Sequence, residues 1–197
     1  MNPPTLFDSG CRPNTLWVRH GESTWNRAGR MQGQSRWPAL TPLGKDQAHK
    51  AARDLLDYEP VRILSSDLQR AFGTAKIIAE VTGLPVERSS LLRERHWGGF
   101  EGRPVSDGQR AEVGLGRDDP LPGGESRTDV ADRLQRVAVE LGQGGGPVVV
   151  VTHGDVIREA VRLWSMPGSS NPTAANGSIT ELWIPMRAQR SGNCQGG

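Results

Sequence analysis

Histidine and arginine side chains follow three apolar runs of the sequence, a pattern that suits chemistry on a phosphate group. Arg19 and His20 follow the first run, Arg70 follows the second, and His153 follows the third. Two guanidinium groups bind a doubly charged phosphate well, and a neutral imidazole can attack phosphorus as a nucleophile. If the runs are strands of one α/β sheet, these side chains meet beyond its carboxyl edge, where such sheets bind ligands. The pattern therefore predicts a phosphate site with a histidine nucleophile.

Each of these residues also has a structural explanation when it is taken singly. A histidine after a strand is most often a capping or core residue, and each arginine can be half of a surface ion pair. Together they are explained less well in this way, because a buried cluster of two arginines and two histidines leaves positive charge uncompensated unless an anion occupies it. The cluster thus favours an anion-binding site.

Strands and helices alternate along the part of the chain that must position these side chains. Apolar runs predict strands at 16–18, 61–64 and 148–151, and the last is uniformly β-branched, as in a central strand buried on both faces. A further strand is expected at 179–184, at an edge of the sheet. Helical spacing of apolar residues and capping signals predict helices from Thr41-Pro42 to Tyr58, from Ser66 or Asp67 to Gly83, from Glu125 to Leu141 and from about Val156 to Trp164.

The alternation predicts an α/β fold, a three-layer α/β/α sandwich with a mostly parallel central sheet and an antiparallel strand at its edge. Residues 96–124 are Gly-rich and charged without a sustained apolar period, so we interpret them as an active-site loop region. Residues 1–14 and 187–197 are expected to be loose tails, and residues 15–186 are expected to form one domain with a single core.

Composition and charge narrow the classes of partner. The 24 Lys and Arg and 22 Asp and Glu residues give a net charge of +2 and are scattered, so no nucleic-acid surface is expected. The longest apolar stretch, around 147–152, is far shorter than the roughly 20 residues of a membrane helix, and no apolar signal core is found at the N-terminus. We therefore expect a cytoplasmic protein, a monomer or homodimer. The phosphate site predicted above makes a small phosphorylated metabolite its expected partner. Cys11 and Cys194 lie in the tails and are interpreted as free thiols without metal-ligand spacing.

Short segments along most of the chain carry a family resemblance. The matching segments are RHGE (19–22), QG (32–33), LTPLGKDQA (40–48), SSDLQRA (65–71), LRER (92–95), FEG (100–102), GGES (123–126) and THG (152–154). In this order they resemble the histidine phosphatase superfamily, in the branch that includes the cofactor-dependent phosphoglycerate mutases. The resemblance implies a phosphoglycerate mutase-like fold and phosphomonoester chemistry through a phosphohistidine, with no metal and no cofactor.

The resemblance also implies roles for individual residues. His20 is the expected nucleophile, and Arg19, Arg70 and His153 are expected to bind the phosphoryl oxygens, where fixed cations stabilise the transition state. Glu94 matches the family's proton donor, which protonates the leaving alkoxide and then activates water. The other implied substrate-binding residues are Ser23, Asn26, Gln32, Gly33 and Gly154.

Asp155, directly beyond the second histidine motif, is an alternative proton donor, because a carboxylate at this place serves in the other branch of the superfamily. Glu94 is preferred because the whole stretch 92–102 resembles the acid-bearing loop. A raised pKa would help this role, whereas Arg93, Arg95 and the site arginines are expected to lower it. Glu22, beside the nucleophile, is expected to be structural.

The segment from Arg103 to Pro122 decides between hydrolysis and transfer. The mutases carry a long insertion here, whereas a short Gly-rich cover should admit water, which a transferase must exclude. The prediction is a phosphatase, with a phosphoglycerate mutase as the alternative. A non-catalytic binder of phosphorylated ligands is disfavoured because nucleophile, acid and phosphate ligands are all present. Arginines of this cover can contact an acidic substrate, although loop arginines are more often solvated; they are Arg103, Arg110 and Arg117.

Overall fold

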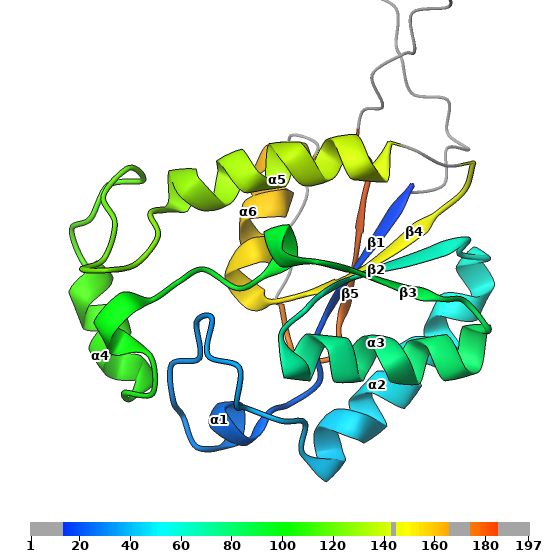
Figure 1. The fold of residues 1–197 in the computed structure, drawn as a ribbon, viewed down its shortest axis with the longest axis horizontal. Coiled ribbons are helices and arrows are strands. Elements are labelled where there is room, and N and C mark those ends of the chain that lie inside the picture. Colours follow the sequence, from blue (N-terminus) through cyan, green and yellow to red (C-terminus); the bar gives the residue numbers. More distant parts are fainter. Residues whose placement is uncertain (1–13, 143–144, 166–173, 185–197) are drawn as a thin grey trace, which may run out of the picture.

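The computed structural model describes residues 14–142, 145–165 and 174–184. Its centre is a five-stranded sheet of order β3-β2-β4-β1-β5 (Figure 1). The strands are β1 (Thr15–Arg19), β2 (Arg62–Ser66), β3 (Val86–Ser89), β4 (Val148–Thr152) and β5 (Ile179–Leu182). Only β5, at the edge beside β1, pairs antiparallel. The predicted mostly parallel sheet with an antiparallel edge strand is confirmed.

Helices cover both faces of this sheet (Figure 1). One face packs against α2 (Pro42–Leu55) and α3 (Gln69–Thr82), and the other packs against α5 (Arg127–Leu141) and α6 (Gly154–Trp164). Successive side chains of a strand point to opposite faces, so Val149 and Val151 pack against α2 and α3, while Val148 and Val150 pack on the other side. Every residue of β4 is buried, as expected for a central strand.

The register of the sheet brings the ends of two strands together. Thr15 of β1 lies opposite Val148 of β4, and Arg19 lies opposite Thr152. Both strands therefore end at the same level, and the residues that follow them, His20 and His153, emerge side by side.

The helix α2 begins at its predicted cap, α5 begins at Arg127, two residues after the predicted Glu125, and α3 lacks its predicted cap. The Thr41 side chain accepts a hydrogen bond from the Gly44 N–H at 3.0 Å, and Ser126 begins α5 with a capping box. The predicted cap of α3 by Ser66 or Asp67 is wrong, because its N-cap is Leu68 and no side chain caps it. The two polar side chains are used elsewhere, in contacts with His153 and Arg93.

The region predicted as an irregular loop, 96–124, also differs. It contains α4 (Val105–Glu112), which lies with the short α1 (Thr24–Arg27) beyond one end of the sheet (Figure 1). A small separate core of Met31, Trp97 and Leu121 supports it. The eight residues of α4 include only two apolar ones, too few to show a helical period. Turns of 3-10 helix complete the fold at Leu56–Tyr58, Ser90–Leu92 and Gly98–Phe100.

The edge strand β3 was not expected from the sequence, since it is short and half exposed. Within the described ranges no helix is long and apolar enough to cross a membrane. Both cysteines and nearly all of the expected tails lie outside the described residues.

Candidate active site

His20 has the geometry and the charge state of a nucleophile. Its side chain is almost fully buried, and its Nδ1 lies 2.7 Å from the carbonyl oxygen of Gly21. Because this oxygen only accepts, Nδ1 carries the proton and the lone pair remains on Nε2. Burial first, and then the charges of Arg70 and Arg19, hold the pKa of His20 well below its ordinary value of 6.5. The imidazole is therefore neutral at neutral pH.

His153 lies next to His20, with 5.1 Å between the ring centroids. Its Nε2 is 2.9 Å from the Ser66 hydroxyl oxygen, which also accepts the Leu68 N–H at 3.3 Å. The Ser66 hydroxyl hydrogen is thus available to Nε2, and this assignment leaves the His153 proton on Nδ1. Burial, followed by the charge of Arg70, lowers the pKa of His153 well below 6.5. His153 therefore offers a neutral N–H donor.

Arg70, which is buried, and Arg19, which is half-buried, supply positive charge. The Arg70 guanidinium donates to the carbonyl oxygens of Ser35 at 3.0 Å and Gly33 at 2.8 Å. Burial lowers the pKa of Arg70 to about 10, so the group keeps its charge at neutral pH. Arg19 donates to the carbonyl oxygen of Ala174, and burial lowers its pKa as well. Neither guanidinium has a carboxylate ion-pair partner among the residues described.

Three buried side-chain nitrogens in the described part of the chain have no hydrogen-bond partner: Arg19 Nε, Arg70 Nε and His153 Nδ1. All three belong to the cluster predicted to bind phosphate. An unpaired buried donor costs about 1–3 kcal/mol, and more when it is charged. An anion that presents several acceptor oxygens would satisfy these donors together. The cluster is therefore chemically suited to a phosphoryl group.

The Glu94 carboxyl group accepts hydrogen bonds from backbone N–H groups and, within the described ranges, from no side chain. Its Oε1 accepts from Arg95 at 2.9 Å, and its Oε2 lies 3.4 Å from the N–H of Asp155. Burial first, and then the Asp155 carboxylate, raise the pKa of Glu94 against the opposing charges of Arg158 and Arg70. A carboxyl group of this kind is protonated at higher pH than usual, as a proton donor requires.

The expected lowering of the Glu94 pKa by the neighbouring arginines does not prevail. Arg93 is 2.5 Å from Asp67, and the Arg95 guanidinium pairs with Glu112 instead. Both charges are thus neutralised away from the Glu94 carboxyl group.

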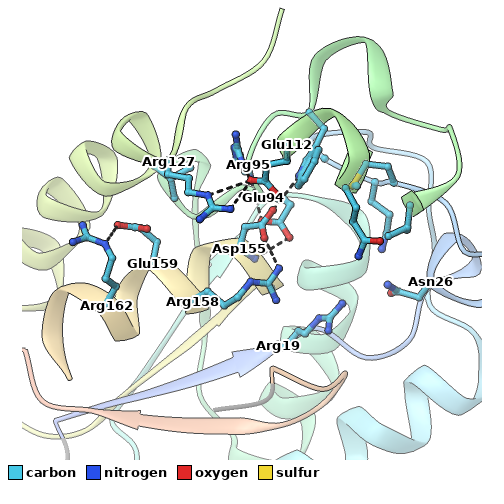
Figure 2. A pocket seen from close by; sticks show the side chains of 18 of the residues that line it. Arg19, Asn26, Glu94, Arg95, Glu112, Arg127, Asp155, Arg158, Glu159 and Arg162 are labelled. Atoms are coloured by element: carbon cyan, nitrogen blue, oxygen red, sulfur yellow. Dashed lines mark hydrogen bonds and ion pairs between the residues drawn. The ribbon is translucent and has the colours of Figure 1, made fainter. Parts of the chain in front are cut away.

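Asp155, the competing proton donor, has both carboxylate oxygens occupied. Oδ2 accepts from Trp97 Nε1 at 3.0 Å, and Oδ1 pairs with Arg158 (Figure 2). Both oxygens are thus engaged by donors of the protein itself, so neither is free to meet a leaving oxygen. The geometry therefore favours Glu94 over Asp155 for this role.

The other residues singled out from the sequence gather around Asn26. The Asn26 side-chain oxygen accepts from the N–H of Ser23 at 3.1 Å and from Asn176 at 3.3 Å. Ser23 is fully buried, and its hydroxyl donates to Gln32 at 2.6 Å. Ser23 thus orients Asn26 and Gln32, and those two side chains line the cavity. Glu22, expected to be structural, accepts a hydrogen bond from the Thr41 hydroxyl at 2.7 Å.

Two residues near the nucleophile were missed from the sequence. Arg158, three residues after Asp155 on α6, faces the site near Arg19 (Figure 2). Its spacing from Asp155, three residues along one helix face, is the sequence signal that could have found it. Asn176 donates to the carbonyl oxygen of His20 at 2.9 Å, and no local pattern marks it.

A cavity of about 530 Å³ adjoins the candidate site at Arg19 and Glu94, and Figure 2 shows side chains that line it. Gly33, Glu94 and Gly154 are in its wall, together with Arg19 and Asn26. Its charged lining comprises seven arginines, Arg19, Arg30, Arg95, Arg117, Arg127, Arg158 and Arg162, against four carboxylates, Glu94, Glu112, Asp155 and Glu159. The lining therefore favours a negatively charged substrate. No group of three or more potential metal ligands occurs among the described side chains.

A neutral histidine, one buried and one half-buried arginine and a protonatable carboxyl group lie at the carboxyl edge of an α/β sheet, and together they suit the chemistry of phosphate esters. The chain belongs to the histidine phosphatase superfamily (branch 1), whose family model matches residues 16–189. The predicted family is thus confirmed.

Several known proteins are similar to this chain. Glucosyl-3-phosphoglycerate phosphatase of Mycobacterium tuberculosis (strain ATCC 25618 / H37Rv) is 37% identical over 86% of this chain and 86% of the relative. A probable phosphoglycerate mutase of Yersinia pestis (strain Pestoides F) is 39% identical over 70% of this chain and 67% of its own length. The solved structure of mycobacterial glucosyl-3-phosphoglycerate phosphatase with VO3 has a TM-score of 0.74 at 32% identity, covering 88% of this chain and 99% of that one. With the family, these relatives show that the chain is a phosphatase, a phosphomonoester hydrolase, as predicted.

Proposed function

We propose that this phosphatase works through a phosphohistidine on Nε2 of His20, without a metal ion, and that its substrate is a phosphoglycerate ester carrying a sugar. The observation that carries the mechanism is the set of unpaired buried nitrogens of Arg19, Arg70 and His153. They lie beside the neutral imidazole of His20, whose proton is on Nδ1 and whose Nε2 therefore keeps its lone pair. Asn26, Gln32, Gly33 and Gly154 complete the substrate contacts in this proposal.

In the first half-reaction, Nε2 of His20 attacks the phosphorus and forms a P–N bond. The ester P–O bond breaks, its electron pair goes to the leaving oxygen, and the carboxyl group of Glu94 protonates that oxygen. Arg19, Arg70 and His153 donate hydrogen bonds to the phosphoryl oxygens, where negative charge is spread in the transition state.

In the second half-reaction, the Glu94 carboxylate takes a proton from water and the water oxygen attacks phosphorus. The P–N bond breaks, its electron pair returns to Nε2 of His20, and inorganic phosphate leaves. Glu94 regains its proton in this step, so both groups are restored for the next cycle.

The substrate proposal rests on the lining of the cavity and on the relatives. Seven arginines against four carboxylates suit a substrate with negative charge. Mycobacterial relatives similar over most of the chain are named for glucosyl-3-phosphoglycerate. The proposal includes a cytoplasmic enzyme that acts as a monomer or homodimer. Return of the phosphoryl group to substrate is a second candidate, which the similarity to a probable phosphoglycerate mutase favours.

The nucleophile is tested with p-nitrophenyl phosphate in excess EDTA. The wild type should hydrolyse it, His20→Ala should not, and mass spectrometry of the quenched wild type should find one phosphoryl group on His20. Full activity of His20→Ala would refute the mechanism, and loss of wild-type activity in EDTA would refute metal independence.

The substrate and the acceptor are tested with two esters. Phosphate release should be faster from glucosyl-3-phosphoglycerate than from 3-phosphoglycerate. Rapid interconversion of 3- and 2-phosphoglycerate with a bisphosphorylated primer, without phosphate release, would establish the mutase instead.

A further inference from the structure

The cavity continues along one face of α6, away from the phosphate site. Asp155, Arg158, Glu159 and Arg162 have the spacing of one helix face, and all four line the cavity. Gly154, at the phosphate end, and Arg162 are eight residues apart in this helix, about 12 Å at 1.5 Å per residue. Glycerate, with three carbons, fills only the near part of such a space. The far part is therefore available to a larger group on the substrate.

Glu159 is the central residue of this far part. Its side chain is 8% exposed and accepts hydrogen bonds from Arg117 Nη2 at 2.5 Å and Arg162 Nε at 2.6 Å. Both bonds end on the same oxygen, Oε1, while Oε2 accepts none from the residues that the structure describes. Figure 2 shows Glu159 and Arg162 on the side of the cavity away from Asn26.

Arg117 is anchored by its own backbone, unlike a solvated loop arginine. Its carbonyl oxygen accepts from the backbone N–H groups of Arg127 at 3.0 Å and Thr128 at 3.2 Å, at the start of α5. The other arginines singled out in the cover, Arg103 and Arg110, both pair with Asp107 and do not line the cavity. Only Arg117 of these three is thus placed to contact substrate.

This cluster offers a free carboxylate oxygen next to the remaining N–H groups of two half-exposed guanidiniums. A sugar hydroxyl both donates and accepts hydrogen bonds, so neighbouring hydroxyls match an acceptor flanked by donors. A second anionic group matches less well, because the Glu159 carboxylate would repel it. The cluster therefore has the chemistry of a hydroxyl-binding subsite.

We infer that Arg117, Glu159 and Arg162 bind the hydroxyl groups of the sugar on the phosphoglycerate ester and so determine the preference for a glycosylated substrate. The inference rests on the proposed function, because it concerns the part of the same substrate that lies farthest from His20.

The test compares two esters in three variants. Glu159→Gln and Arg117→Gln should lower kcat/KM for glucosyl-3-phosphoglycerate by roughly 10–100-fold, the range for losing a hydrogen bond to a charged group. The kcat/KM for 3-phosphoglycerate should change by less than about threefold, within the spread of a surface substitution. Arg110→Gln is the matched control, because it removes an arginine–carboxylate pair of the same cover outside the cavity, and it should leave both values unchanged. Equal losses on both esters, or no loss on either, would overturn the subsite.

A binding measurement separates this inference from the proposed function. Glucosylglycerate should inhibit hydrolysis of p-nitrophenyl phosphate by the wild type more strongly than glycerate does, and Glu159→Gln should remove the difference. Equal inhibition by the two compounds in the wild type would overturn the subsite even if both esters are hydrolysed. If neither ester releases phosphate, the proposed substrate fails, while a difference in inhibition that depends on Glu159 still supports sugar binding.

Discussion

Replacement of Arg70 by glutamine should separate the binding of phosphate from the stability of the fold. Arg70 is fully buried, and burial lowers its pKa to about 10, a shift that corresponds to about 3 kcal/mol of cost for holding the charge. Arg70→Gln removes this cost. It also weakens the hydrogen bonds to the carbonyl oxygens of Gly33 and Ser35, which costs about 1–3 kcal/mol per unsatisfied group. The opposing effects should leave the phosphate-free variant within about 3 kcal/mol of the wild type.

Added phosphate should stabilise the wild type more than it stabilises Arg70→Gln. At a phosphate concentration 100 times the Kd, the wild type gains about 2.7 kcal/mol, which raises Tm by roughly 5–11 °C for a chain of this size. Loss of a charge-assisted interaction of about 1.5–3 kcal/mol raises the Kd of Arg70→Gln by about 10–100-fold. At the same phosphate concentration the variant should then gain only about 0.4–1.4 kcal/mol. Calorimetric thermal unfolding over a series of phosphate concentrations measures the stabilisation of the wild type and of the variant.

Arg95→Gln is the matched control, because Arg95 is also a buried arginine, only 2% exposed. Its charge is paired with Glu112, and it donates to the Glu125 carbonyl oxygen at 2.8 Å. This variant should lose stability without phosphate but keep the full rise in Tm with it. A full rise in Arg70→Gln, or a rise lost equally in both variants, would refute the assignment of Arg70 to the phosphate site.

Three further predictions follow from the same geometry. Glu94→Gln should slow 3-phosphoglycerate by about 10²–10⁴-fold and p-nitrophenyl phosphate, whose leaving group needs little protonation, far less; equal slowing would place the proton donor elsewhere. Burial lowers the pKa of His20, so kcat/KM for 3-phosphoglycerate should persist well below pH 6.5, and an acidic fall centred at or above pH 6.5 would contradict the neutral His20. Burial raises the pKa of Glu94, so kcat/KM should fall as pH rises through that pKa, and this alkaline fall should disappear in Glu94→Gln. Gly44→Ala should destabilise the fold by about 1–3 kcal/mol in urea unfolding, because its Cβ would lie 2.0 Å from the Glu22 carbonyl oxygen, whereas Gly99→Ala has open space and should not; equal stabilities would show that the two backbones separate at no cost.

The phosphate cluster could be predicted because it depends on regular elements. The β-branched run 148–151 marks a central strand, and the ends of parallel strands meet at one edge of a sheet, so His20 and His153 had to emerge together. Arg70 follows from the same rule, since it lies in the first turn of the helix after β2. No side-chain detail is needed for any of these placements.

Features that depend on contacts between distant segments could not be predicted. The sequence around α4 has too few apolar residues for a period, and its support by Met31 and Trp97 comes from other segments. Asn176, which contacts the His20 carbonyl oxygen, is 156 residues away along the chain. The anchoring of Arg117 against the start of α5 likewise exists only in the folded chain.

The missing cap of α3 and the raised pKa of Glu94 have a common origin. Asp67, which the sequence places as a helix cap, instead pairs with Arg93, and this pairing neutralises a charge adjacent in sequence to the proton donor. Arg95 on the other side is neutralised in the same way by Glu112. With both flanking arginines engaged, burial is the largest influence on Glu94 and raises its pKa. The helix thus forgoes a cap worth about 1 kcal/mol, and the carboxyl group proposed as proton donor holds its proton to higher pH.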